Sequence, residues 1–341
     1  MSKPKAPPKS SRVTIKTVAA DAGVSVAAVS KVMRNAYGVS VELRKKVQSS
    51  IDRLDYRPSV AARGMRGQTF TIGVLLVELA NPFLPQIIDG VNEVLAESNY
   101  KAMLGVGQSD MKLEAKLIES MIDYRMDGLI LVAPQLQGSQ LAKFAKQIPM
   151  VIIGHHEATA STFDTVNSDD QEGAAVAVRA FVEAGIKDIA MLSIVLDDPN
   201  DANVITQREL GYKQAMQKAG IASHSRILRV AYDNQRRPKA VLELLQQRHR
   251  PRAVFCWSDL DAVHVIDAAK QLKLRVPQDI AVIGYDNSSV AGLATVNLSS
   301  IDQSGKRLGS LAAERLLTRI EGRSLSSHVL LEPSLRTRGS H

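Results

Sequence analysis

Residues 13 to 34 read VTIKTVAADAGVSVAAVSKVMR and decide the fold of the N-terminal part of the chain. Thr14 is a good helix N-cap, and apolar residues follow it at helical spacing. Gly23 stands where a tight turn needs a residue that accepts a positive φ. Ser25 then caps a second short helix that runs to about Met33. Two short helices joined by a glycine-containing turn predict a helix-turn-helix, whose second helix enters the major groove of DNA.

The charge of the N-terminal segment favours this interpretation over an ordinary helical hairpin. Residues 1–66 hold 14 Lys and Arg against 4 Asp and Glu, a net charge of +10, whereas the whole chain carries +8. The remaining residues therefore carry a net charge of −2. A basic segment joined to a nearly neutral body is typical of a separate nucleic-acid-binding domain.

The quoted stretch also resembles the LacI/GalR family of bacterial transcription regulators. The resemblance extends through VSVELRKKVQSSIDRLDYRP at residues 39–58, AARGM at 61–65 and TIGVLL at 71–76, and then to the C-terminus. It implies a hinge helix that orders on operator DNA and a core of two Rossmann-like lobes. It also implies that Met65, where the family usually has Leu, is pushed into the minor groove, although Ser59 replaces the usual Asn.

The head and the hinge contain our candidates for DNA contact. Val26 and Ala27 are apolar side chains suited to thymine methyl groups, and Lys31 is suited to guanine O6 and N7. A third predicted helix, residues 41–54, has a basic side that either meets phosphates or is simply solvated. The candidates are Thr14, Lys16, Ser25, Val26, Ala27, Ser30, Lys31, Arg34, Arg63 and Met65.

Length and composition suit a cytoplasmic protein of several domains. A chain of 341 residues fits two or three domains, and its one cysteine, Cys256, rules out an internal disulfide framework. We find no apolar run long enough for a membrane span, and the basic N-terminus has no apolar region of the kind found in secretory signals. We expect a disordered basic tail at residues 1–11, a helix-turn-helix domain at 12–57, a hinge at 58–69 and an effector-binding and dimerisation core at 70–341. The tail either adds phosphate contacts or only aids solubility.

Beyond residue 70, apolar β-rich runs alternate with helical stretches. The predicted strands are Thr71–Val77, Lys101–Gly105, Gly128–Val132, Val151–Gly154, Ile189–Ser193, Arg226–Val230, Ala253–Trp257 and Ala281–Tyr285. This alternation predicts parallel sheets covered on both faces, either as one large sheet or, as we favour, as two lobes. The family resemblance implies an α/β core of periplasmic-binding-protein type, with lobe 1 at about 70–166 and 298–322 and lobe 2 at about 167–297 and 323–341.

Ligands of open α/β sheets bind at the carboxyl ends of the strands, and in two facing lobes these ends line a cleft. Carboxylates and an arginine at such ends suit a sugar or a sugar acid. The resemblance places Arg208, in its R-x-x-G pattern, and Asp286, in its G-Y-D pattern, on effector-binding positions of the family, and puts Ser258 where Asn is usual. Helix capping is the alternative role for Asp169, Asp170 and Glu172, and lobe packing for Phe83. The effector-binding candidates are Asn81, Phe83, Asp169, Glu172, Arg208, Ser258 and Asp286.

Other site motifs are absent or incomplete. Gly105-Val106-Gly107 lacks the third glycine of a dinucleotide fingerprint, because Asp110 stands there. His155 and His156 are adjacent and have no accompanying cysteine, so a loop or cleft role is favoured over a metal site. We therefore expect no catalytic residues, no metal and no cofactor.

Together these features predict a homodimeric, sequence-specific DNA-binding repressor, controlled by a small sugar or sugar-acid effector bound between two lobes. Its partners would be double-stranded operator DNA, the effector and a second copy of the chain, with no membrane involved. Two alternatives stay open at this point. One is a sugar-binding receptor without DNA function, and the other is an α/β sugar-modifying enzyme.

Overall fold

The computed structural model describes residues 13–33, 36–57, 67–196, 202–231 and 236–341. The chain divides into a small unit, residues 1–69, and a larger unit, residues 70–341. Three DNA-contact candidates, Arg34, Arg63 and Met65, and most of the expected hinge lie outside the described residues. Of the helices in the described ranges, none combines the length and the apolar character that crossing a membrane requires.

The small unit is built from three helices, α1 (Ile15–Asp21), α2 (Val26–Met33) and α3 (Val41–Arg53). The Thr14 hydroxyl accepts the Thr17 N–H and so caps α1, and Ser25 Oγ accepts the Ala28 N–H at 3.1 Å at the start of α2. Gly23, between the two helices, has φ +59°, as the turn requires. The predicted helix-turn-helix therefore forms, and its small core consists of Val18, Ala19, Ala22, Val29, Val32, Val47 and Tyr56.

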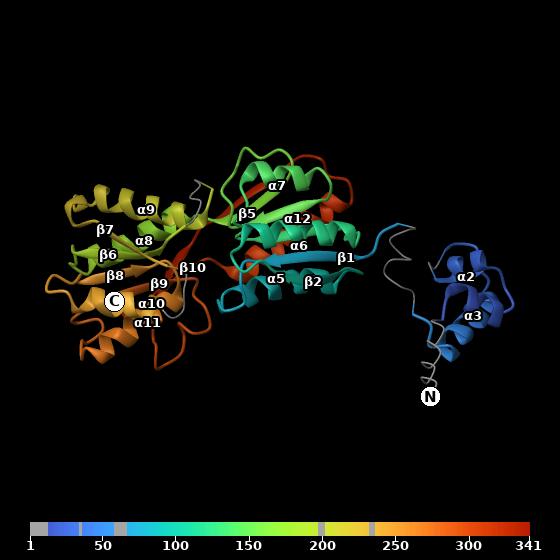
Figure 1. Ribbon diagram of the computed structural model, residues 1–341, viewed down its shortest axis with the longest axis horizontal. Coiled ribbons are helices and arrows are strands. Elements are labelled where there is room, and N and C mark those ends of the chain that lie inside the picture. Colours follow the sequence, from blue (N-terminus) through green and yellow to red (C-terminus); the bar gives the residue numbers. More distant parts are fainter. Residues whose placement is uncertain (1–12, 34–35, 58–66, 197–201, 232–235) are drawn as a thin grey trace, which may run out of the picture. The chain divides into compact units, whose positions relative to one another are not determined.

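The larger unit contains two lobes, each with a six-stranded sheet among its described residues (Figure 1). The first sheet is parallel throughout and has the order β11-β5-β4-β3-β1-β2. Its strands are β1 (Thr71–Leu76), β2 (Lys101–Val106), β3 (Gly128–Val132), β4 (Met150–Ile153), β5 (Asp164–Ser168) and β11 (His328–Leu331). Its helices are α5 (Leu84–Ala96), α6 (Met111–Asp123), α7 (Gly138–Ala145) and α12 (Gly305–Ile320).

The second sheet repeats this plan in the order β12-β10-β9-β8-β6-β7, with only β12 antiparallel to its neighbour. Its strands are β6 (Ile189–Ile194), β7 (Arg226–Val230), β8 (Ala253–Cys256), β9 (Ala281–Tyr285), β10 (Ser299–Asp302) and β12 (Ser334–Arg336). Its helices are α8 (Asp170–Glu183), α9 (Val204–Lys218), α10 (Arg236–Gln246) and α11 (Asp259–Gln271), with the short 3-10 helix η1 (Ala222–His224).

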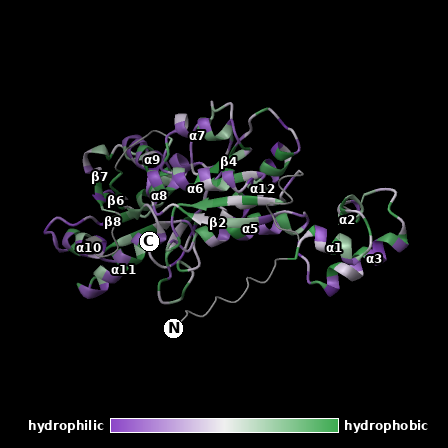
Figure 2. Ribbon diagram, turned by 45° about the vertical axis from the view of Figure 1, so that its right-hand side comes forward, coloured by the Kyte–Doolittle hydropathy of each residue, from purple (hydrophilic) through white to green (hydrophobic). Residues whose placement is uncertain are grey.

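Each sheet has an apolar core on both of its faces, as parallel strands with helices on both sides require. In the first lobe one core includes Ile130 and Val132 of β3, and the other includes Leu129 and Leu131 of the same strand. In the second lobe two further cores divide the sheet in the same way. Figure 2 accordingly shows green, hydrophobic strands between helices that carry both green and purple residues.

All eight predicted strands form, whereas β5, β10, β11 and β12 were missed. The strand β5 reads DTVNS and is fully buried, so its polar composition hid a strand that lies inside a sheet. Two expected lobe boundaries are also wrong. The chain is still in the second sheet at β10, and β11 pairs with β5 in the first sheet although we expected residues 323–341 in the second lobe.

Two glycines bring α5 and α12 into unusually close packing within the first lobe. A Cβ atom added at Gly309 of α12 would lie 1.9 Å from the Ile87 carbonyl oxygen, and one added at Gly90 of α5 would lie 1.9 Å from the Lys306 carbonyl oxygen. These nearest atoms belong to the backbone of a helix, which cannot move aside as the end of a flexible side chain can. This contact therefore depends on glycine, and it fixes the returning segment of the chain to the first lobe.

Replacing Gly309 with Val should destabilise the larger unit, because the added side chain would separate α5 from α12. We expect a loss of about 3 kcal/mol, measured as a lower urea midpoint by circular dichroism. Gly292→Val is the matched control, since a Cβ atom at Gly292 meets nothing closer than 3.9 Å. Equal midpoints for the two variants would contradict the close-packing argument.

Candidate functional site

The first candidate site is the exposed side of α2 in the small unit. Ala27 and Lys31 are exposed and lie four residues apart, on the same side of the helix, while Val29 and Val32 are buried in the core. Thr14, Lys16 and Ser25 are also exposed, and Val26 and Ser30 are half-buried. On α3, Arg53 is paired with Asp21 of α1, so this one basic side chain is engaged within the head.

The second candidate site is a cavity of about 670 Å³ in the larger unit, lined by residues of both lobes. Its wall includes the carboxyl ends of β3 and β4 in the first lobe and of β6 and β9 in the second. Four of the predicted effector-binding residues line it: Asn81, Phe83, Arg208 and Asp286. Phe83 also packs into the core of the first lobe, which is the alternative role considered for it, and its contact with an effector stays a prediction.

The other three predicted residues do not line the cavity. Asp169 caps α8 by accepting the Glu172 N–H at 3.0 Å, and Glu172 pairs with Arg179 at 2.6 Å beside a separate groove of α8 and α9. Ser258 is buried, where it caps α11 and donates to Asp261 at 2.6 Å. Side chains around a helix N-terminus point in different directions, and here Ser168 and Asp170 are the ones that reach the cavity wall.

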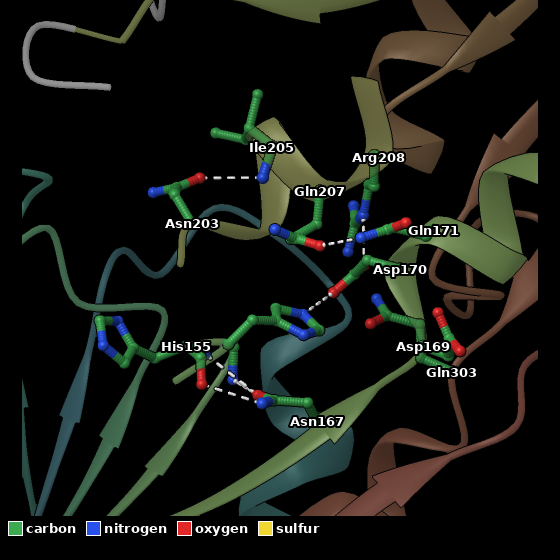
Figure 3. A network of polar contacts seen from close by, with 12 residues as sticks. His155, Asn167, Asp169, Asp170, Gln171, Asn203, Ile205, Gln207, Arg208 and Gln303 are labelled. Atoms are coloured by element: carbon green, nitrogen blue, oxygen red, sulfur yellow. Dashed lines mark hydrogen bonds and ion pairs between the residues drawn. The ribbon is translucent and has the colours of Figure 1, made fainter. Parts of the chain in front are cut away.

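Asp170 and Arg208 form the buried centre of the polar network drawn in Figure 3. Arg208 Nε donates to Asp170 Oδ1 at 2.7 Å, and His156 Nε2 lies 2.7 Å from Asp170 Oδ2. Arg208 Nη1 donates to the Trp257 carbonyl oxygen at 2.5 Å, and its Cζ atom lies 3.7 Å from the centre of the Tyr285 ring. The arginine is thus held by both a carboxylate and an aromatic face.

The ionisation of this pair follows from its surroundings. Burial alone would raise the pKa of Asp170, but the charge of Arg208 and the hydrogen bond from His156 outweigh it and lower that pKa. Burial likewise opposes the charge on Arg208, and the charge of Asp170 outweighs this effect and raises the arginine pKa. Both groups therefore stay charged, as a buried pair must to satisfy each other.

Asp286 lies in a different electrostatic setting at the same cavity. Burial raises its pKa to about 8, against the opposing effect of Arg208. Asn81 Nδ2 donates to its Oδ2 at 3.2 Å, and Gln303 Nε2 donates to its Oδ1 at 2.6 Å. Its backbone has φ +107°, a conformation that is costly for a non-glycine residue and that often marks a functional position.

The two lobes are joined by hydrogen bonds at two places around the cavity. On one side His156 bonds to Asp170, and its backbone N–H donates to the Ala202 carbonyl oxygen at 2.8 Å. On the other side Asn81 bonds to Asp286, and Gln86 Nε2 donates to the Asn287 carbonyl oxygen at 3.2 Å. These bonds link the two lobes directly on both sides of the cavity.

Sequence reasoning missed Ser168, Trp257 and Gln303 as cavity residues. Ser168 is the last residue of β5, and Trp257 directly follows β8. The strand-end rule could therefore have found both residues once the ends of these two strands were known. The two adjacent histidines have separate partners, since His155 Nε2 lies 2.9 Å from Glu157. Within the described ranges, no group of three or more His, Cys, Asp and Glu residues is arranged to hold a metal ion.

Comparisons with known proteins identify the family of both units of the chain. The family model described as bacterial regulatory proteins, lacI family, matches residues 14–59, and a periplasmic binding protein-like domain matches residues 178–341. The chain is 33% identical over 332 residues, 96% of each chain, to the HTH-type transcriptional repressor PurR of Pectobacterium carotovorum subsp. carotovorum. It is 31% identical to catabolite control protein A of Priestia megaterium over 311 residues, which cover 90% of this chain and 92% of the relative.

Solved structures show the same architecture. A complex of the transcriptional regulator CelR with cellobiose superposes with a TM-score of 0.70 at 27% identity, covering 97% of this chain and all of the other. A lac repressor dimer bound to operator and the anti-inducer ONPF superposes with a TM-score of 0.83, covering 97% and 99% of the two chains. Because the sequence identity between the two chains is only 23%, this superposition supports the fold alone.

A capped helix-turn-helix joined to a two-lobed core with a ligand cavity defines a ligand-responsive, DNA-binding transcription regulator. The chain belongs to the LacI family of bacterial regulatory proteins. The PurR relative that establishes this is a transcriptional repressor rather than an enzyme, so the enzyme alternative and the receptor without DNA function are set aside.

Replacing Glu114 with Gln should reduce the pH dependence of stability. Glu114 is buried on α6, accepts the N–H of the cavity residue Gln135 at 2.9 Å, and has its pKa raised by burial from 4.5 to about 7. The native state therefore holds this proton more tightly than the unfolded state. The resulting stabilisation is fully present below pH 4.5 and is lost as the pH rises through about 7.

The variant keeps a neutral side chain of the same shape, so its stability should fall less than that of the wild type across this pH range, by on the order of 3 kcal/mol. Urea denaturation at a series of pH values measures the difference. Glu119→Gln, at an exposed position of the same helix, should follow the wild type. Parallel pH profiles for Glu114→Gln and the wild type would show that Glu114 ionises normally.

Proposed function

We propose that this protein is a repressor in which two copies of the small unit bind one nearly palindromic operator, and in which a sugar or sugar-acid effector binds in the cavity. The observation that carries the proposal is the pairing, in one chain, of an exposed α2 surface with a cavity whose polar walls bridge two lobes. A repressor that acts on DNA in this way would work in the cytoplasm. A mobility-shift assay with the DNA upstream of the gene for this protein tests the proposed DNA binding. The absence of any retarded complex at low salt would refute the proposal.

For the DNA-binding surface we propose direct base contacts from α2. Exposed Ala27 and half-buried Val26 would meet thymine methyl groups, and exposed Lys31 would reach guanine. Thr14, Lys16, Ser25 and Ser30 would bind the sugar-phosphate backbone, where Ser25 also contributes the N-terminus of a helix. Arg34, Arg63 and Met65 remain proposed contacts on the strength of the family pattern.

For the regulatory step we propose that effector binding changes how the lobes close. The inter-lobe bonds of His156 with Asp170 and of Asn81 with Asp286 border the cavity, so a ligand there would alter them. Coupling between ligand and DNA sites in such proteins is typically about 1–3 kcal/mol. The CelR structure holds cellobiose, which supports a sugar as the class of effector.

For the oligomer we propose a homodimer that covers the edge strand β2. This strand borders the first sheet on one side, and its Met103 and Leu104 side chains are about half exposed. An exposed apolar edge strand is a liability that proteins normally cover. The neighbouring lac repressor structure is a dimer bound to operator, which fits one half-site per copy.

Replacing Lys31 with Ala should weaken operator binding mainly at one base pair. The expected loss is about 1–3 kcal/mol on the native operator, and much less on operators already changed at that pair. Mobility-shift titrations with single-base operator variants measure this pattern. Lys45→Ala, on the exposed side of α3, is the control and should weaken all sequences alike. A uniform loss for Lys31→Ala would make it a phosphate contact instead.

Replacing Arg208 with Met should abolish the effector response, while operator binding without effector should persist in variant protein that circular dichroism shows to be folded. The wild type is first screened with a panel of sugars and sugar acids for those that change operator affinity, and the variant is then titrated with each active compound. Arg229→Met is the control, because Arg229 pairs with Glu209 outside the cavity wall. A normal response in Arg208→Met would remove this residue from the effector site.

A further inference from the structure

The Arg208 guanidinium is already engaged by the protein itself. Its Nε donates to Asp170 at 2.7 Å and its Nη1 donates to the Trp257 carbonyl oxygen at 2.5 Å. The Tyr285 ring covers one face, with 3.7 Å between the Arg208 Cζ atom and the ring centre. An arginine that grips a carboxylate or phosphate on a ligand normally does so with two parallel N–H bonds. Here two of its three nitrogens and one of its faces are taken.

Asp170 already supplies a carboxylate to Arg208 from within the protein. One carboxylate oxygen accepts from Arg208 and the other lies 2.7 Å from His156 Nε2, so both oxygens are held by partners on opposite lobes. Asp170 and Arg208 are both buried, which keeps water from weakening the pair. To bind Arg208 in the same way, an anionic ligand would have to displace the carboxylate of Asp170, which is covalently part of the protein. Otherwise the ligand would have to approach Arg208 while Asp170 remains bound to it.

The remaining charges on the cavity wall also disfavour an anion. Four carboxyl side chains line the cavity, and only two basic side chains do. Lys112, the second basic residue, is exposed at the first turn of α6, where water screens its charge. Asp286 offers an anion no positive charge, and its two oxygens already accept from the amides of Asn81 and Gln303.

The polar groups that do suit a ligand are neutral. Ser168 lines the cavity, and its buried Oγ has no hydrogen-bond partner among the described residues. A buried hydroxyl without a partner is costly, so a ligand hydroxyl that bonds to it gains binding free energy. Phe83 and Trp257 contribute aromatic surface to the same wall, of the kind that packs against sugar rings.

We propose that the effector of this regulator carries no negative charge and is an uncharged, hydroxyl-bearing molecule such as a neutral sugar, because Asp170 neutralises Arg208 from within the cavity. The proposal rests on the function proposed above and narrows its effector class, since it excludes the sugar acids. Asp170 is then a residue that sets specificity, through its effect on Arg208.

The first test needs no knowledge of the effector. In Asp170→Ala, sodium formate should fill the vacated carboxylate position and raise Tm by about 2–4 °C over the same concentration of sodium chloride. Glu172→Ala is the control, because it removes a carboxylate that does not line the cavity. This variant and the wild type should each have the same Tm in both salts. The double variant Asp170→Ala/Arg208→Met should lose the formate effect. If Asp170→Ala does not fold, Asp170→Gly, which also vacates the carboxylate position, provides the same comparison.

Two outcomes of this test would overturn the proposal. Formate that stabilises the wild type as much as Asp170→Ala would mean that Arg208 is open to anions in the native protein. Formate that stabilises none of the Asp170 variants would mean that Asp170 does not stand in for an external carboxylate.

The second test compares matched sugars on the full-length protein. Glucose with glucuronate, and galactose with galacturonate, are titrated against the protein–operator complex and by thermal shift. For a pair that acts, the neutral sugar should bind the wild type at least about tenfold more tightly, and Asp170→Asn should shift this ratio toward the acid by about tenfold or more. Tighter binding of the acid to the wild type would overturn the proposal. Operator binding without sugar, measured in the same titration, reports separately on the proposed DNA-binding function.

Discussion

The buried ion pair of Asp170 and Arg208 is the interaction on which the arrangement of the larger unit depends. Two charges removed from water are tolerated only when each satisfies the other and the remaining polar atoms find partners. Here the first turn of α8 supplies the carboxylate, and the first half of α9 supplies the arginine. Trp257, which follows β8, and Tyr285, which ends the neighbouring strand β9, provide the other contacts of the arginine. Any change in the relation of these elements would leave a buried charge without its partner.

The same pair connects to the other lobe through His156, so a structural requirement of one lobe becomes a link between both. The chain passes between the sheets near residues 168–170, 302–305 and 331–334, because β5, α12 and β11 belong to the first lobe while α8, β10 and β12 belong to the second. Three covalent connections limit how far the two lobes can move apart. This restriction suits the proposed switch between two arrangements of the lobes.

Much of the fold could be predicted because its signals are local. Caps at Thr14, Ser25 and Ser40, a glycine with positive φ, and apolar runs for the central strands are each visible within a few residues. The missed strands lack such signals. β5 is buried although Asp164 and Asn167 are polar, since Arg319 and Arg323 pair with Asp164, and Asn167 Oδ1 accepts the Gly154 N–H. A polar segment becomes a core strand only when distant residues supply its partners.

The residues of the cavity likewise fall into those that the sequence predicted and those that only the structure revealed. The strand-end rule and the family resemblance together selected Asn81, Arg208 and Asp286, which line the cavity, and also Asp169, Glu172 and Ser258, which do not, because neighbouring side chains point in different directions. By itself, the sequence determined a basic helix-turn-helix head on an α/β body, since helix caps, charge and apolar periodicity act over short distances along the chain. Only the tertiary structure decided that Asp170, and not Asp169, faces Arg208, and that His156 of the other lobe completes the network. Pairing of buried charges depends on groups far apart in sequence, and their geometry exists only after the sheets have formed.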